Sequence, residues 1–84
     1  MSYTYQNKGV CSRSVTFDVE EGKLKNISFV GGCQGNLRGI GLLAEGMDVT
    51  VARDKLRGVD CGNRGTSCPD QLSLAIDAYL NDEL

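Results

Sequence analysis

The segment Ser14–Gly32, "SVTFDVEEGKLKNISFVGG", decides the fold because its pattern is that of two strands joined by a tight turn. In its first half, apolar and polar residues alternate with the period of two that indicates a half-buried strand. The apolar set is Val15, Phe17 and Val19, and the polar set is Thr16, Asp18 and Glu20.

The second half of this segment predicts the partner strand. "EEGK" at positions 20–23 predicts a turn in which Gly22 takes a positive φ. Ile27 and Phe29 then resume the inward face. Leu24 has the opposite parity, so we expect a β-bulge or a late strand start near Lys25–Asn26. Upstream, "SYTYQ" at positions 2–6 predicts a short edge strand by the same alternation.

Downstream, the period changes to that of a helix. In "CQGNLRGIGLLAEG", positions 33–46, four apolar residues recur at helical spacing, and we expect them to form a buried stripe. These are Leu37, Ile40, Leu43 and Ala44. Gly35, Gly39 and Gly41 each weaken this helix by up to about 1 kcal/mol relative to alanine. The helix must therefore be held by tertiary contacts, or its glycines let another backbone approach closely.

A second helix is predicted in "DVTVARDKLRG", positions 48–58. Asp48 is a suitable N-cap, and Gly58 a suitable stop. Val49, Ala52 and Leu56 share one face of this helix.

The last helix is the clearest of the three. Pro69 suits its first turn, and Ser67 and Asp70 have the spacing of a capping box, with aspartate in place of the usual glutamate. The expected buried stripe consists of Leu72, Ala75, Ile76, Tyr79 and Leu80.

This order of elements, strands first and helices after, predicts an α+β fold. We expect an N-terminal antiparallel hairpin or small sheet of two or three strands, packed with about three C-terminal helices. The chain has 84 residues, so we expect one domain over 1–84. A core this small is thin, which favours a staple or a symmetric homodimer.

Composition excludes several classes of function. The net charge of −2 argues against nucleic-acid binding through a basic surface. The sequence contains no apolar run long enough for a membrane span and no signal peptide, so we expect a cytoplasmic protein whose thiols stay reduced. Histidine is absent, which excludes Ser-His and Cys-His nucleophile pairs and any zinc finger with histidine ligands.

The candidate functional residues are the four cysteines, Cys11, Cys33, Cys61 and Cys68. All four lie at the ends of predicted elements, and such ends can converge at one pole of a small domain. Cys33 and Cys68 also stand at predicted helix starts, where partial positive charge favours thiolates.

The spacing of the cysteines leaves three interpretations open. The first is a metal site with all four cysteines as ligands. We expect it to hold a structural Zn²⁺ ion, and the alternative is an iron–sulfur cluster. The second is a redox helper in which Cys61 and Cys68 cycle between dithiol and disulfide. The third is a set of inert structural thiols. Catalysis has the least support, because the acidic pairs fall in a turn and at the C-terminus.

At "CGNRGTSCPDQL", positions 61–72, the chain resembles the TSCPD domain family, whose name is spelled by Thr66 to Asp70. The whole chain is similar in length to the small stand-alone members, which carry four cysteines. The resemblance implies that the four cysteines found here are a metal site.

The same domain is an appendage of ribonucleotide reductases, notably the adenosylcobalamin-dependent enzymes. The resemblance therefore implies an association with deoxyribonucleotide synthesis, with a ribonucleotide reductase or a nucleotide as partner. It does not imply that this chain is a reductase, because 84 residues cannot supply the barrel and radical site of that enzyme. The stretch from Cys11 to Cys61 also resembles iron–sulfur scaffold proteins of the NifU-like class.

Overall fold

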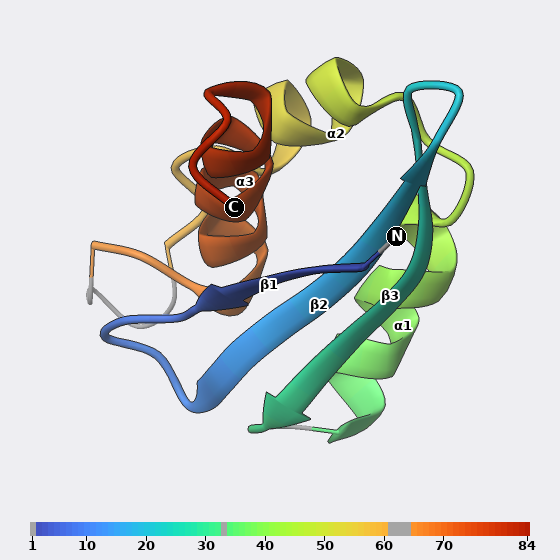
Figure 1. The fold of residues 1–84 in the computed structure, drawn as a ribbon. Helices are drawn as coiled ribbons and strands as arrows, with labels where there is room; N and C mark the ends of the chain where they lie inside the picture. The colour runs from blue at the N-terminus through green and yellow to red at the C-terminus, as the bar shows by residue number, and fades with distance from the viewer. Residues whose placement is uncertain (1, 33, 61–64) are drawn as a thin grey trace.

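The computed structural model describes residues 2–32, 34–60 and 65–84, and in these ranges three strands are followed by three helices (Figure 1). The elements are β1 (Ser2–Gln6), β2 (Ser12–Glu20), β3 (Lys23–Gly31), α1 (Gln34–Ala44), α2 (Val49–Leu56) and α3 (Cys68–Leu80). The strands form one antiparallel sheet in the order β1-β2-β3. The predicted α+β fold is confirmed, including the short edge strand.

The turn between β2 and β3 is as tight as the sequence predicts. Only Glu21 and Gly22 separate the two strands, and both have positive φ, 52° and 77°. A two-residue loop with two positive φ values has the twist that matches paired strands. Gly22 adopts this conformation without strain, whereas Glu21 does so against the preference of a residue with a Cβ atom.

The predicted bulge is present in β3. Thr16 pairs with Ser28 but Asp18 pairs with Lys25, so one residue of β2 faces two residues of β3. Asn26, at the extra position, has a φ of 54°, which asparagine tolerates better than most residues. The inserted residue explains how Leu24 reaches the core despite its opposite parity.

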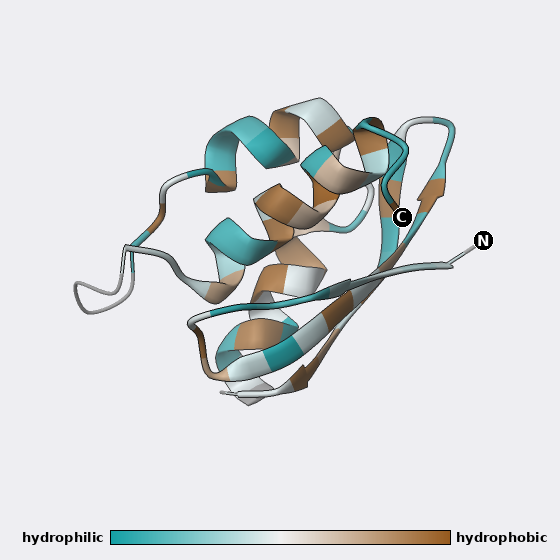
Figure 2. Ribbon diagram, turned by 60° about the vertical axis from the view of Figure 1, so that its left-hand side comes forward, coloured by the Kyte–Doolittle hydropathy of each residue, from teal (hydrophilic) through white to brown (hydrophobic). Residues whose placement is uncertain are grey.

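The helices cover one face of the sheet, and the other face is polar. Figure 2 shows apolar and polar residues alternating along the strands beneath the helices. The core between the two layers consists of Val15, Phe17, Leu24, Ala44, Val49, Ala52, Leu72, Ala75 and Ile76. Tyr3, Phe17 and Tyr79 add an aromatic cluster at one end, with ring centroids 4.7 to 6.3 Å apart.

Helix α1 packs on β3 through a glycine. A Cβ atom at Gly41 would lie 3.2 Å from the carbonyl oxygen of Ile27, so here the sequence-based expectation of a close backbone approach is confirmed. The predicted stripe is wrong at Leu43, whose side chain is 81% exposed. The reason is that α1 packs on β3 with the side that carries Leu37, Gly41 and Ala44, and Leu43 lies to one side of that contact.

Helix α2 begins and ends as predicted. The Asp48 carboxylate accepts hydrogen bonds from the backbone N–H groups of Thr50 and Val51, and Gly58 follows the helix with a φ of 79°. The helix packs on α3, where Arg53 and Arg57 both form ion pairs with Asp77.

Helix α3 buries most of its predicted stripe, with Leu72, Ala75 and Ile76 fully inaccessible. The prediction is wrong for Leu80, the last residue of the helix, which is 40% exposed. None of the helices in the described ranges is long and apolar enough to cross a lipid bilayer.

Candidate functional site

Two of the four candidate cysteines meet at one end of the molecule. Cys11 lies at the end of the β1–β2 connection, and Cys68 is the first residue of α3. Their Sγ atoms are 3.8 Å apart, although 57 positions separate them in the sequence. Cys11 is exposed and Cys68 is buried, so the pair sits at the boundary between solvent and core.

The other two candidates, Cys33 and Cys61, lie outside the described residues. The predicted pairing of Cys61 with Cys68 falls there too. Their described neighbours nevertheless reach the same place. A Cβ atom at Gly32 would lie 3.1 Å from the Cys11 sulfur, and Asp60 lines the same cavity as Cys11 and Cys68.

The start of α3 is fixed by its own sequence. Ser67 is the N-cap, and its hydroxyl accepts a hydrogen bond of 3.1 Å from the Asp70 N–H. Pro69 occupies the first turn, where a missing N–H costs nothing. Cys68, between these two residues, is thereby held at the first helical position.

The Asp70 side chain does not complete the predicted capping box. Its buried carboxylate instead accepts hydrogen bonds from the Gly58 N–H, at 2.7 Å, and from the Thr66 hydroxyl, at 2.6 Å. Asp70 therefore ties the end of α2 to the start of α3. The reason is that each of its two carboxylate oxygens is already bonded to one of these donors.

Gln71 is a positioning residue that the sequence analysis missed. Its amide nitrogen donates to the Thr66 hydroxyl at 2.9 Å, and its amide oxygen accepts from the Lys8 N–H at 3.0 Å. The second bond holds the β1–β2 connection, which carries Cys11, against α3. The side chain of Gln71 is 4% exposed. The sequence did carry a signal for this burial, because Gln71 stands three residues after Cys68 and four before Ala75 and so shares a helix face with them.

Ser12 is a second residue that was missed. Its hydroxyl oxygen lies 3.0 Å from the Cys68 sulfur and accepts a hydrogen bond of 2.8 Å from the Asn7 side-chain amide. Because the oxygen already accepts from Asn7, the hydroxyl proton can point at the sulfur. A register shift between Ser12 and Ser14 turns Ser12 toward the helices, and alternation alone does not reveal this.

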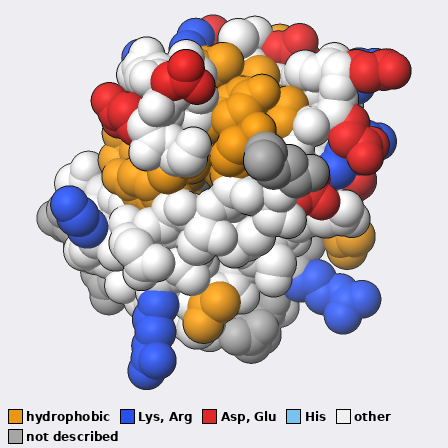
Figure 3. All heavy atoms as spheres, viewed as in Figure 1, with side chains coloured by type: hydrophobic (Ala, Val, Ile, Leu, Met, Phe, Trp, Pro, Cys, Tyr) orange, Lys and Arg blue, Asp and Glu red, His pale blue; other side chains and the backbone are white. Residues whose placement is uncertain are grey.

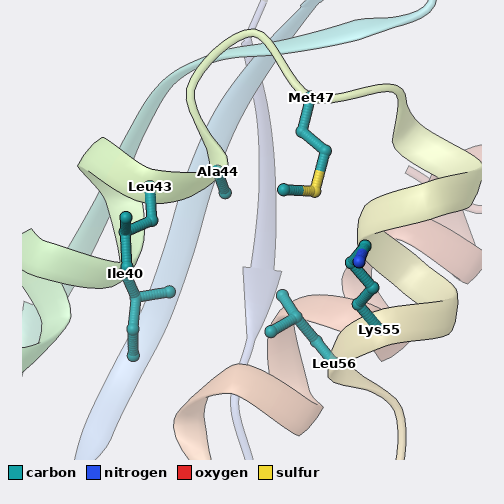
Figure 4. Close-up of a pocket in the computed structure, with 6 residues that line it drawn as sticks. All are labelled: Ile40, Leu43, Ala44, Met47, Lys55 and Leu56. Carbon is teal, nitrogen blue, oxygen red and sulfur yellow. The ribbon is translucent and has the colours of Figure 1, made fainter.

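The two sulfurs stand at one end of a groove between α1 and the rest of the helical layer. The cavity at the thiol end has a volume of about 520 Å³, and α1 contributes Gly35, Asn36, Leu37, Gly39, Ile40 and Leu43 to its lining. Ile40 and Leu43 also line a second hollow of about 120 Å³ beside α2. Figure 4 shows Ile40 and Leu43 on one side of this hollow and Met47 and Leu56 on the other.

The two described cysteines do not by themselves form a metal site. Within 2–32, 34–60 and 65–84, no three side chains of cysteine, histidine, aspartate or glutamate lie together in a way that could hold a metal ion. The four-cysteine site thus stays a prediction, of which the structure describes two sulfurs.

Comparison with known proteins gave a family match. A model of the TSCPD domain matches residues 2–80. No curated protein and no solved structure matches the chain.

Proposed function

The chain belongs to the TSCPD domain family, and we propose that it is a thiolate metal-binding module with Cys11, Cys33, Cys61 and Cys68 as the ligands. Zinc is the metal we expect, and an iron–sulfur cluster is the alternative that the same four thiolates could hold. The observation that carries the proposal is the 3.8 Å distance between the Cys11 and Cys68 sulfurs.

The distance between the two sulfurs matches the spacing of ligands in a zinc site. A tetrahedral zinc site has Zn–S bonds of about 2.3 Å, which requires sulfur–sulfur edges of about 3.8 Å. The contact of Gly32 with Cys11, and the position of Asp60 in the thiol cavity, bring the chain on the N-terminal side of Cys33 and of Cys61 to the same pole. In the sequence, Cys33 directly follows Gly32 and Cys61 directly follows Asp60, which supports the choice of these two cysteines as the remaining ligands.

The surroundings of Cys68 also suit a ligand thiolate. The Ser12 hydroxyl can donate to its sulfur, and Ser12 is itself held by Asn7. Hydrogen bonds of this kind orient a metal ligand. Four thiolates close the coordination sphere, so the metal would supply structural stability to the thin core rather than an open position for catalysis.

Metal analysis tests the proposal. Protein purified from cytoplasmic expression without added metal is expected to contain one zinc per chain by elemental analysis, or iron with matching sulfide. Cys11→Ser and Cys68→Ser are each expected to lower the metal content severalfold. Removal of the metal by a chelator is expected to lower the denaturation midpoint, because metal binding is coupled to folding.

Ile76→Val is the matched control. It lowers the free energy of unfolding by about 0.5–1.5 kcal/mol without touching a thiol, so its metal content should stay that of the parent protein. Metal well below one per chain in the parent protein, together with a chelator-insensitive midpoint, would contradict the proposal.

A second candidate function is dithiol–disulfide exchange, and the exposure of Cys11 beside Cys68 favours it. Here the two thiols would give two electrons and two protons to a partner's disulfide, which becomes a dithiol while the Cys11–Cys68 bond forms. The pair expected from the sequence, Cys61 with Cys68, lies outside the described residues and stays a prediction. Mass spectrometry after alkylation in glutathione buffers tests this, and a pair that stays reduced at every ratio argues against it.

The partner that the family resemblance suggests is a ribonucleotide reductase. We propose a cytoplasmic accessory role in deoxyribonucleotide synthesis, supported by the family membership. Purified adenosylcobalamin-dependent reductase should show a change in turnover or in self-reactivation when the metal-loaded protein is added. No change in either, and no co-migration of the two proteins, would remove this role while leaving the metal site intact.

A further inference from the structure

Strand β1 is an edge strand whose outward peptide groups can be identified. The Asn7 N–H donates to the carbonyl oxygen of Arg13, so Asn7 forms a hydrogen-bonded pair with β2. Such pairs alternate along an antiparallel ladder. The odd-numbered residues of β1 therefore bond to β2, and the N–H and C=O groups of Ser2, Thr4 and Gln6 point away from the sheet.

The opposite edge of the sheet is covered in its first half. On β3, the Leu24 N–H donates to Met47 and its carbonyl accepts from Gly46. Farther along, the Glu45 carboxylate accepts from the Asn26 N–H. No hydrogen bond to the outward peptide groups of Thr4 or Gln6 is found among the described residues. The fold thus bonds outward peptide groups of β3 at Leu24 and Asn26, whereas those of Thr4 and Gln6 on β1 have no such bonds among the described residues.

The sequence of β1 also lacks the usual protections of an edge. "SYTYQ" contains no lysine, no other charge and no proline, and its pairing with β2 runs without a register shift. Natural edge strands commonly carry one of these devices, which prevent pairing with another strand. In Figure 3, which shows this side of the molecule, the central area is mainly uncharged and the charged side chains lie around it.

We propose that β1 pairs antiparallel with the β1 strand of a second copy of this chain, so that the two sheets become one. A two-fold axis at Thr4 brings Thr4 opposite the partner's Thr4 and Ser2 opposite the partner's Gln6. In this register the outward-pointing groups of Ser2, Thr4 and Gln6 meet outward-pointing groups of the partner, so each of these pairs exchanges both of its hydrogen bonds.

A second copy fits this edge because the strand is complementary to itself. In the same register, Tyr3 lies opposite the partner's Tyr5 on the helix side, and the threonines lie opposite each other on the polar side. Aromatic pairs and threonine pairs are both favourable across strands. With no charge in the strand, no like charges are opposed. The inference is independent of the thiol site at the other end of the β1–β2 connection.

Two lysine variants test the proposal. Thr4, Thr16 and Ser28 form one row across the polar face, with Thr4 on β1 and Ser28 on β3. Thr4→Lys opposes two like charges at the two-fold axis, whereas Ser28→Lys places the same charge on the same face away from it. Thr4→Lys is expected to weaken dimerisation at least about tenfold and Ser28→Lys to leave it unchanged.

The measurements are sedimentation equilibrium of untagged protein up to millimolar concentration and amide hydrogen exchange. We expect twice the chain mass at high concentration, with slowed exchange of the Thr4 and Gln6 amides as the dimer forms. A protein that stays monomeric, or a dimer that both lysine variants weaken equally, would overturn the proposal. So would a dimer that is insensitive to Thr4→Lys but lost in Leu43→Glu, because that result locates the interface in the groove.

Discussion

Each residue from Thr66 to Asp70 has a separate physical task at the start of α3. Ser67 caps the helix, Pro69 starts it, and Cys68 is presented at the thiol site between them. Thr66 and Asp70 bond to each other, and Asp70 also accepts from Gly58. The motif therefore positions one sulfur and joins two helices with the same few residues.

The Asp70 carboxylate is expected to be the most sensitive polar group of this motif. In Asp70→Asn, one of the two donors would face an amide N–H in place of an acceptor oxygen. We expect the free energy of unfolding to fall by about 1–3 kcal/mol, measured by urea denaturation. Asp54→Asn is the matched control, because Asp54 is exposed on α2 and its ion pair with Arg53 contributes little. Equal stability of the two variants would show that the Asp70 bonds do not hold the helices together.

Asp48 is expected to make stability depend on pH. The Thr50 hydroxyl, followed by the N–H groups of Thr50 and Val51, holds the pKa of this carboxyl below its ordinary value of 3.8. A lowered pKa means that the carboxylate stabilises the folded protein above 3.8, and that this contribution is lost as the pH falls through the lowered pKa.

The comparison that isolates this effect is with Asp48→Asn, which keeps an N-cap oxygen but does not titrate. The parent protein should exceed the variant in urea midpoint at neutral pH, and the difference should shrink in acid. Asp18, whose pKa is lowered by hydrogen bonds from Ser2 and Asn26, titrates in both proteins and cancels in the difference. A difference that stays constant with pH would contradict this assignment.

Among the elements, α1 depends most on its surroundings. It carries three glycines, and only one of them is needed for packing. Gly41 lies against the backbone of β3, whereas Cβ atoms at Gly35 and Gly39 would meet nothing within 4 Å. The same residue type therefore has two different consequences within one helix.

This difference gives a matched pair of variants. Gly39→Ala should raise the free energy of unfolding by up to about 1 kcal/mol, because alanine favours the helix and its methyl group enters open space. Gly41→Ala should gain less or lose stability, because its Cβ presses on the Ile27 carbonyl at 3.2 Å. Thermal or urea denaturation shows which of the two variants is more stable. If Gly41→Ala is the more stable of the two, the packing described here is wrong.

At the scale of the whole molecule, the helical layer is divided. Helix α1 packs on β3, while α2 and α3 pack on each other and α3 reaches β1 and β2. The groove lies between these two parts, with the thiol pair at one end and Met47 near the other. The sheet therefore joins two helical units that share few contacts of their own.

Local unfolding of the helices should reflect this division of the helical layer into two units. Amides of α1, Gln34–Ala44, are expected to exchange with solvent at lower free energy than those in the middle of α3, because few buried contacts and three glycines support α1. Native-state hydrogen exchange in increasing denaturant measures this. Exchange of both helices at one common free energy would show that the molecule opens as a single unit.

Much of this architecture could be predicted from the sequence because it depends on local patterns. Period-two alternation located β2 and β3, the parity of Leu24 predicted the bulge, and Asp48, Gly58 and Pro69 marked helix ends. Each of these signals acts within a few residues, so one chain suffices to recognise it.

The candidate site was predictable only in part. The sequence determined by itself which residues are cysteines, that Cys11 and Cys68 stand at element ends and that the chain is a TSCPD domain. Only the tertiary structure decided that Cys11 meets Cys68, that Gln71 and Ser12 hold them there, and that Leu43 faces a groove rather than the core. The physical reason is distance along the chain: these contacts join segments far apart in sequence, and their geometry depends on how the two layers pack, which no local pattern encodes.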